Sequence, residues 1–269
     1  LATRLMDNAI DASHFPLPAQ AEQARGTRRI GLGLTGLADA LIMLGLHYGE
    51  EPARALAAKI MQTICHAAYA ASVELARAKG PFPFFERDRY LDGPFIRMLP
   101  PELRRGIADH GIRNSHLTAV APTGTISLLA NNISSGLEPV YDFSYTRRMT
   151  GTNGQLMSHE LRDEAFRRYR ELNPAGTLPR AFVAAHQLAP EAHLAMQAAL
   201  QPFVDSSISK TINVPTEYAF PAFQDIYSRA YDLGLKGCTT FRPNPITGEI
   251  LSREAEPVSH CCNIDREAD

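Results

Sequence analysis

The segment between Glu51-Pro52 and Gly80-Pro81 constrains the fold more than any other part of the chain. Its apolar side chains recur every three or four residues, as in one long amphipathic helix: Leu56, Ile60, Ile64, Ala67, Ala71 and Leu75. Proline suits the first turn of a helix, and a glycine followed by proline is a typical helix end. At ~1.5 Å per residue this helix would be about 40 Å long. Such a length suits the outer layer of a large domain.

The remaining sequence alternates between helical and extended patterns, which predicts an α/β fold. We expect further helices near Leu5–Ile10 and over residues 33–46, 159–172, 190–204 and 216–233. Short strands are expected over residues 116–121, 140–145, 211–214 and 237–241. In the 190–204 helix, Met196, Leu200 and Phe203 form an apolar face. His193, Gln197 and Gln201 lie on a polar one.

Composition excludes several classes of protein. The chain has 269 residues, 45% of them hydrophobic and 21% charged, as in an ordinary globular protein. Its formal net charge of -2 gives no basic field for nucleic acid. No apolar run approaches the roughly 18 residues that span a bilayer, and no signal peptide begins the chain. The 4 cysteines form no disulfide framework, so we expect a reducing, cytoplasmic setting.

The run Gly31-Leu32-Gly33-Leu34-Thr35-Gly36 matches the G-x-G-x-x-G pattern of dinucleotide-binding proteins. Such a site needs a buried strand before the glycines, so that the pyrophosphate meets the start of a helix. Residues 25–29 are polar and do not form a buried strand. We therefore interpret the glycines as positions of close helix packing.

A second motif, Pro122-Thr123-Gly124-Thr125-Ile126-Ser127, follows the predicted strand over residues 116–121. The amides at the start of a helix have no intrahelical partners and carry partial positive charge. Together with the three hydroxyl side chains, they make a candidate cradle for phosphate. An ordinary helix cap with Thr or Ser is the alternative.

Lys210 lies among hydroxyl and amide side chains in residues 207–215. This lysine is a candidate for a second anion contact. The alternative is that the segment is the start of a strand with capping side chains. Cys238, in a predicted strand, has the pattern of a buried small hydrophobic residue. Cys261 and Cys262 are adjacent in a polar, proline-bearing tail. A disulfide between neighbours is strained and easily reduced. No zinc-ligand spacing surrounds these cysteines, and no metal site is predicted.

These segments together resemble the large subunit of ribonucleotide reductases, in particular the adenosylcobalamin-dependent class II. The resemblance rests on residues 28–39, 113–115, 121–127 and 134–139, then His193 with Met196-Gln197, and finally residues 209–215 and 235–242. They occur in the family's order and extend to about Asn244. In the iron-dependent relatives two adjacent tyrosines relay a radical, whereas this chain has Thr239-Thr240 at the corresponding place. Threonine cannot hold a radical as a phenol does, which favours the cobalamin class.

The resemblance implies the later part of the ten-stranded α/β barrel, preceded by helices. Residues 1–115 would be a mainly helical segment flanking the barrel, residues 116–242 the barrel segment with the phosphate loop, and residues 243–269 a flexible tail. It also implies that Pro122 to Ser127 bind the diphosphate of a ribonucleotide. The complete enzyme would then use adenosylcobalamin to reduce ribonucleotides to deoxyribonucleotides through a cysteine radical.

The family's radical cysteine and reducing cysteines have no counterpart among residues 1–269. We therefore expect no catalytic residue here and no turnover by the isolated chain. Cys261-Cys262 is a candidate for the family's C-terminal redox pair, with free thiols as the alternative. Three hypotheses follow: part of a reductase whose N-terminal half is a separate polypeptide or was removed, a non-catalytic nucleotide- or phosphate-binding module, or a structural or regulatory subunit. The partners expected are the ribonucleotide substrate and either an N-terminal reductase half or further copies of this chain.

Overall fold

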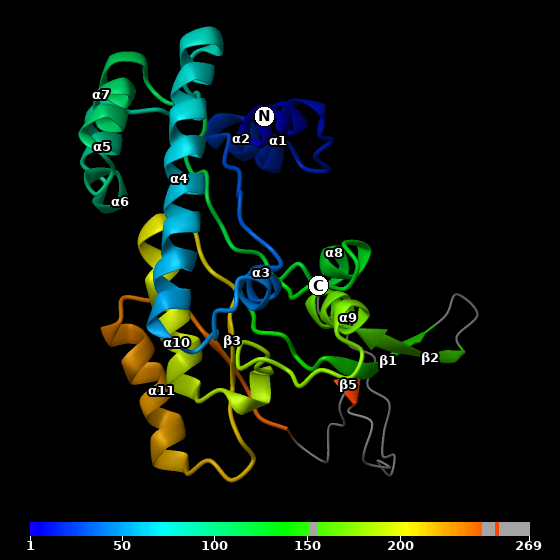
Figure 1. Cartoon of the computed structure of the whole chain (residues 1–269). Helices are drawn as coiled ribbons and strands as arrows, with labels where there is room; N and C mark the ends of the chain where they lie inside the picture. The colour runs from blue at the N-terminus through cyan, green and yellow to red at the C-terminus, as the bar shows by residue number, and fades with distance from the viewer. Residues whose placement is uncertain (151–154, 244–250, 253–269) are drawn as a thin grey trace.

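The computed structural model describes residues 1–150, 155–243 and 251–252, and its longest element is the helix α4 (Glu51–Lys79) (Figure 1). The predicted long helix is confirmed, but its apolar stripe coincides only in part with its buried face: Leu75 is buried, and Leu56 and Ile64 pack against the core. Ala67 is exposed and Ile60 is half-buried, whereas Ala57, Met61 and Cys65 are fully buried. The buried face is thus displaced by about one residue. Small side chains along it let neighbouring helices approach closely.

Other helices pack along α4 on several sides (Figure 1). Of the described helices, five lie near the carboxyl half of α4: α1 (Ala2–Ala12), α2 (Pro18–Thr27), α5 (Arg87–Leu91), α6 (Pro94–Arg97) and α7 (Pro101–His110). Those near its amino half are α3 (Leu37–Met43), α10 (Pro190–Leu200), the 3-10 turns η1 (Ala185–Gln187) and η2 (Gln201–Phe203), and the more distant α11 (Phe220–Asp232). The hydrophobic core divides in the same way, with separate clusters at the two halves of α4.

The first helix buries polar side chains instead of its apolar ones. Leu5 in α1 is 70% exposed, whereas Asp7 is fully buried. The Asp7 carboxylate accepts hydrogen bonds from Arg28 Nε at 2.7 Å and from Asn114 Nδ2 at 3.2 Å. Burial of a carboxylate is tolerable only with such partners. The helix predicted near Leu5–Ile10 is present, and residues distant in sequence select its buried face.

Parallel extended segments form the sheet part of the fold. β3 (Thr211–Asn213) pairs in parallel with β4 (Thr239–Phe241). Isolated parallel bridges join Leu32 to Thr118 and Val120 to Ile208. The segments therefore lie side by side in the order 30–32, 116–120, 206–213 and 239–241. The predicted α/β class is confirmed, while the described residues form no closed barrel and residues 116–121 make bridges only.

A separate antiparallel sheet has the strand order β2-β1-β5. Its strands are β1 (Ser144–Thr150), β2 (Leu156–Arg162) and β5 (Leu251–Ser252). The strand predicted over residues 140–145 thus begins at Ser144, and it lies outside the parallel segments. The helix predicted from residue 159 is wrong in its first turn, since α9 (Glu164–Leu172) begins after Asp163 caps it. Pairing with β1 holds residues 159–162 extended.

Candidate functional site

The turns that follow two parallel segments lie together. Segment 30–32 leads to Thr35, and segment 116–120 leads to Pro122 and Thr123. The hydroxyl oxygens of Thr35 and Thr123 are 2.8 Å apart. In α/β sheets, ligands bind beyond the carboxyl ends of the strands. This edge is therefore the candidate site, and the structure joins two motifs that are 88 residues apart in sequence.

The motif from Pro122 to Ser127 forms a turn and the helix α8 (Gly124–Leu129). Thr123 has a left-handed backbone with φ of 55° and precedes the first helical residue. Gly124 and Thr125 are exposed, and a Cβ atom added at Gly124 would meet no atom within 4 Å. The first turn of α8 is therefore open to solvent, and the amides of a first helical turn have no partner within the helix.

The hydroxyl groups of the motif are used differently. Ser127 is buried, and its Oγ donates to the Gly124 carbonyl at 2.8 Å and lies 3.1 Å from Ser135 Oγ. Thr123 Oγ1 accepts a hydrogen bond from the Gly136 amide at 2.8 Å. These two side chains shape the loop from inside. Thr125 is the hydroxyl residue of the motif that is left exposed.

Residues 134–138 support this loop by hydrogen bonds to its inner side. The Gly36 amide donates to the Ser134 carbonyl at 2.7 Å, which ties the segment to the turn after residues 30–32. Gly136 has φ of 54°, and a Cβ atom there would lie 2.9 Å from the Ala121 carbonyl oxygen. Glycine at this position is therefore required both by the backbone conformation and by the close approach of the loop.

Buried acidic side chains fix the first end of the supporting segment. Asp39 in α3 accepts hydrogen bonds from the Ser134 amide at 2.6 Å and from the Ala165 amide at 3.2 Å. Asp163 caps α9 by accepting from the Phe166 amide at 3.0 Å. Burial and the nearby Asp39 carboxylate raise the pKa of Asp163 to about 8.

An ion pair between buried Lys210 and half-buried Glu138 fixes the other end. Lys210 Nζ lies 2.5 Å from Glu138 Oε2 and 2.9 Å from His193 Nδ1, and the Thr211 amide donates to Glu138 Oε1 at 2.6 Å. Burial lowers the pKa of Lys210, and the Glu138 charge opposes this. Burial and the Lys210 charge lower the pKa of His193 to about 3, so the neutral ring accepts from the ammonium group. Lys210 is thus held inside the fold.

The polar face predicted for the 190–204 helix is wrong as a solvent-facing surface. His193 and Gln197 are fully buried, and Gln201 is 8% exposed. Gln197 Nε2 donates to the Gly237 carbonyl at 2.7 Å. Sequence periodicity missed His193 as a partner of Lys210, because the two meet only after α10 packs against β3. The one available signal was the cluster of polar residues within a mostly apolar helix.

The glycine run of residues 31–36 permits close approach, as predicted, but the neighbour is an extended segment and no helix. A Cβ atom at Gly33 would lie 2.1 Å from the Ala119 carbonyl oxygen. One at Gly31 would lie 3.0 Å from Ala119 Cβ. The parallel pairing of Leu32 with Thr118 depends on this contact.

The described cysteines are not activated thiols. Cys65 is buried, and burial raises its pKa to about 12, with a smaller contribution from Asp205. Burial also raises the pKa of Cys238, which was predicted to be buried and is partly buried against an apolar cluster. Cys261 and Cys262 lie outside the described residues. Within the described ranges, no group of three or more His, Cys, Asp and Glu side chains could hold a metal ion.

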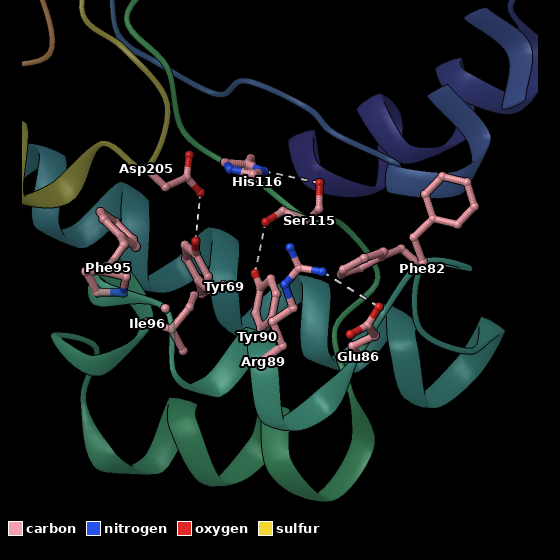
Figure 2. A pocket seen from close by; sticks show the side chains of 13 residues that line it. Tyr69, Phe82, Glu86, Arg89, Tyr90, Phe95, Ile96, Ser115, His116 and Asp205 are labelled. Atoms are coloured by element: carbon pink, nitrogen blue, oxygen red, sulfur yellow. Dashed lines mark hydrogen bonds and ion pairs between the residues drawn. The ribbon is translucent and has the colours of Figure 1, made fainter. Parts of the chain in front are cut away.

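A pocket of about 350 Å³ lies at the amino ends of the same parallel segments (Figure 2). Sequence reasoning did not predict it. Aromatic side chains, among them Tyr69, Tyr90 and Phe95, line this pocket, and Asp205 also lines it. The Asp205 carboxylate accepts hydrogen bonds from the Tyr69 hydroxyl at 2.7 Å and from the Leu117 and Thr118 amides at 2.7 and 3.0 Å. Its acceptors are thus used within the fold.

Comparisons with known proteins agree with this architecture. The family model described as ribonucleotide reductase, barrel domain, matches residues 1–241. A vitamin B12-dependent ribonucleoside-diphosphate reductase of Mycobacterium tuberculosis (strain CDC 1551 / Oshkosh) is 37% identical over 272 residues, covering 95% of this chain and 37% of that protein. A Thermoplasma acidophilum protein with the same description is 32% identical, covering 93% of this chain and 33% of that protein.

A more distant relative, the ribonucleoside-diphosphate reductase subunit alpha of Treponema pallidum, is 26% identical and covers 88% of this chain and 27% of that protein. The chain therefore spans about a third of the length of these curated relatives. No helix in the described part of the chain is long and apolar enough to cross a membrane. With the family model matching residues 1–241 of 269, the chain belongs to the ribonucleotide reductase barrel-domain family and corresponds to a portion of a B12-dependent reductase.

Proposed function

We propose that this chain supplies the substrate-phosphate site of a B12-dependent ribonucleotide reductase, with the turn and first helical residues Pro122-Thr123-Gly124-Thr125-Ile126-Ser127 binding the diphosphate of a ribonucleotide. The observation that carries this proposal is the exposed first turn of α8, where Gly124 faces open space. Backbone amides at such a position are suited to phosphate oxygens.

Two features of the surroundings support the proposal. The loop lies at the carboxyl ends of parallel segments, where ligands of α/β proteins bind. It is also held by residues 134–138, which are fixed at one end by Asp39 and at the other by the Glu138–Lys210 pair. A loop fixed in this way loses little conformational entropy when an anion binds.

The division of chemistry follows from the side chains present. Neither Cys65 nor Cys238 has a lowered thiol pKa, so the described residues offer no reactive thiolate. We propose that this chain binds and orients the ribonucleotide, and that cysteine chemistry comes from elsewhere in the complete enzyme. The isolated chain would then bind nucleotide without reducing it.

The named relatives point to adenosylcobalamin as the cofactor of the complete enzyme, where it would supply the initiating radical. Strand β4 was considered above in relation to the radical source. In it, Thr240 Oγ1 lies 2.8 Å from the Tyr227 hydroxyl. That contact serves the packing of α11 on β4 and offers no donor set for a corrin. We assign no residue of this chain to cobalamin and derive no step through it.

The proposal is tested by isothermal titration of the purified chain with ADP and CDP. In Gly124→Asp, the new carboxylate would point into the proposed phosphate position, while an acidic residue in the first turn stabilises a helix. The matched control is Leu129→Asp, which adds the same charge at the far end of α8, where the side chain is 89% exposed.

We expect nucleotide binding by the wild type and by Leu129→Asp, and its loss in Gly124→Asp. Equal binding by all three proteins would show that the nucleotide lies elsewhere. No binding by the wild type would show that this part of the chain forms no phosphate site by itself.

A further inference from the structure

The glycine run of residues 31–36 leads into a helix start that the chain itself fills. The amides of Ala38 and Asp39, in the first turn of α3, donate to Ser134 Oγ at 3.1 and 3.3 Å. The Gly36 amide donates to the Ser134 carbonyl at 2.7 Å. Because these amides already have partners, they do not offer an anion the donors of a free helix start. The run must contribute to the neighbouring phosphate loop in another way.

The side chain of Thr35 joins this run to the phosphate loop. Its Oγ1 lies 2.8 Å from Thr123 Oγ1 and 3.2 Å from the Ser134 carbonyl oxygen. The Gly136 amide donates to both threonine hydroxyls, at 3.2 Å to Thr35 and at 2.8 Å to Thr123. Thr35 therefore contacts the loop and also residues 134–138, the segment that supports the loop.

Thr123 has a backbone conformation that needs such contacts. Its φ of 55° and ψ of 24° are left-handed, which a β-branched residue rarely adopts. Such a conformation is costly and persists only where the surrounding groups hold it. The Ser127 amide donates to the Thr123 carbonyl at 2.8 Å, and the backbone angles of Thr123 set the direction of this carbonyl. The conformation of Thr123 therefore also fixes the start of α8.

We infer that Thr35 is a positioning residue for the phosphate loop: its hydroxyl holds Thr123 in the left-handed conformation and thereby keeps the first turn of α8 in place. The inference deepens the proposed function and rests on it for the identity of the ligand. It also gives the glycine run a role. A Cβ atom at Gly33 would lie 2.1 Å from the Ala119 carbonyl oxygen, so glycine lets the run pass close enough for the two hydroxyls to meet.

Two substitutions at Thr35 separate its hydroxyl from the bulk of its side chain. Thr35→Val keeps the shape and removes the hydroxyl, whereas Thr35→Ser keeps the hydroxyl. Thr123→Gly removes the need for the contact, because glycine adopts a positive φ readily. The matched control is Thr63→Val in α4, which removes a hydroxyl that donates to the Lys59 carbonyl at 2.8 Å.

The test is hydrogen–deuterium exchange of the Ser127 amide, followed by NMR, with the buried α4 amides as the reference for global unfolding. Relative to this reference, we expect Thr35→Val to lower the protection of Ser127 about five- to tenfold, as the loss of one hydrogen bond would. Thr35→Ser and Thr63→Val should match the wild type. Adding Thr35→Val to Thr123→Gly should lower the protection less than about twofold, because the contact is then already absent.

Unchanged protection in Thr35→Val would overturn the inference, as would an equal fall in Thr35→Ser or in the Thr123→Gly background. A wild-type Ser127 amide without protection would also overturn it, because the start of α8 would then not be held. ADP titrations of the same proteins separate the two proposals. With the phosphate site as proposed, ADP affinity should fall about tenfold in Thr35→Val and stay unchanged in Thr35→Ser and Thr63→Val. If exchange follows the expected pattern while no protein binds ADP, the proposed function is wrong and the positioning role of Thr35 stands.

Discussion

The two ends of the parallel segments use buried acids in opposite ways. At the amino ends, the Asp205 carboxylate accepts hydrogen bonds from the Tyr69 hydroxyl and from the Leu117 and Thr118 amides, beside the aromatic side chains of the pocket (Figure 2). At the carboxyl ends, Asp39 and Glu138 hold a supporting segment and leave the first turn of α8 exposed. Acidic side chains at the amino ends thus stabilise the fold, while those at the carboxyl ends position a loop whose backbone amides stay available.

The largest effect is expected from removing the Asp205 carboxylate at the amino ends of the parallel segments. Asp205→Ala leaves two amides and a hydroxyl without their acceptor in a buried place. We expect the free energy of unfolding to fall by about 4 kcal/mol, measured by urea denaturation, since each unpaired buried donor costs about 1–3 kcal/mol. In the protein that remains folded, ADP affinity should change little. A loss of stability below about 1 kcal/mol would contradict the role given to Asp205.

A smaller effect is expected where the segments lead to the phosphate loop. Gly33→Ala places a methyl group 2.1 Å from the Ala119 carbonyl oxygen, whereas Gly31→Ala meets only the Ala119 methyl at 3.0 Å. We expect Gly33→Ala to lower the free energy of unfolding by about 3 kcal/mol and Gly31→Ala by about 1 kcal/mol, in the range of overpacking costs. ADP affinity should fall with Gly33→Ala. Equal effects of the two substitutions would contradict the close backbone approach.

The smallest effect, taken over a single pH unit, is the pH dependence of stability that comes from Asp163. Its pKa is raised from 3.8 to about 8 in the folded state, so its contribution is fully present below about pH 4 and is lost as the pH rises through about 8. Over that window the free energy of unfolding should fall by at most about 1.4 kcal/mol per pH unit relative to Asp163→Asn. Urea denaturation of both proteins across this range measures the difference. Parallel curves would contradict the raised pKa of Asp163.

The sequence predicted those features that depend on local pattern. The length of α4, the α/β class and the turn before α8 follow from helical periodicity, alternation of elements and glycine placement. The orientation of α4 could not be predicted, because its buried face is selected by α7 and α10, which lie far along the chain. Residues 159–162 of β2 were predicted to be helical, and pairing with β1 overrides their local preference.

The residues that support the candidate loop could not be predicted from the sequence, for a similar reason. Asp39 and Ser134 are 95 residues apart, and Glu138 and Lys210 are 72 apart. Nothing in the local spacing of these residues shows that they meet. The motifs from which the family resemblance arose nevertheless include all four residues. Their common place in the structure gives a physical reason for that pattern.

The most direct test of the central claim is a titration of the ¹⁵N-labelled chain with ADP, followed by its amide NMR signals. We expect the NMR signals of the Gly124 and Thr125 amides, at the carboxyl ends of the parallel segments, to shift with saturable dependence on ADP. The amides of Tyr90 and His116, beside the amino-end pocket, should stay in place. Saturable shifts at Tyr90 and His116 with none at Gly124 and Thr125 would contradict the account, because the nucleotide would then bind at the opposite end of the sheet.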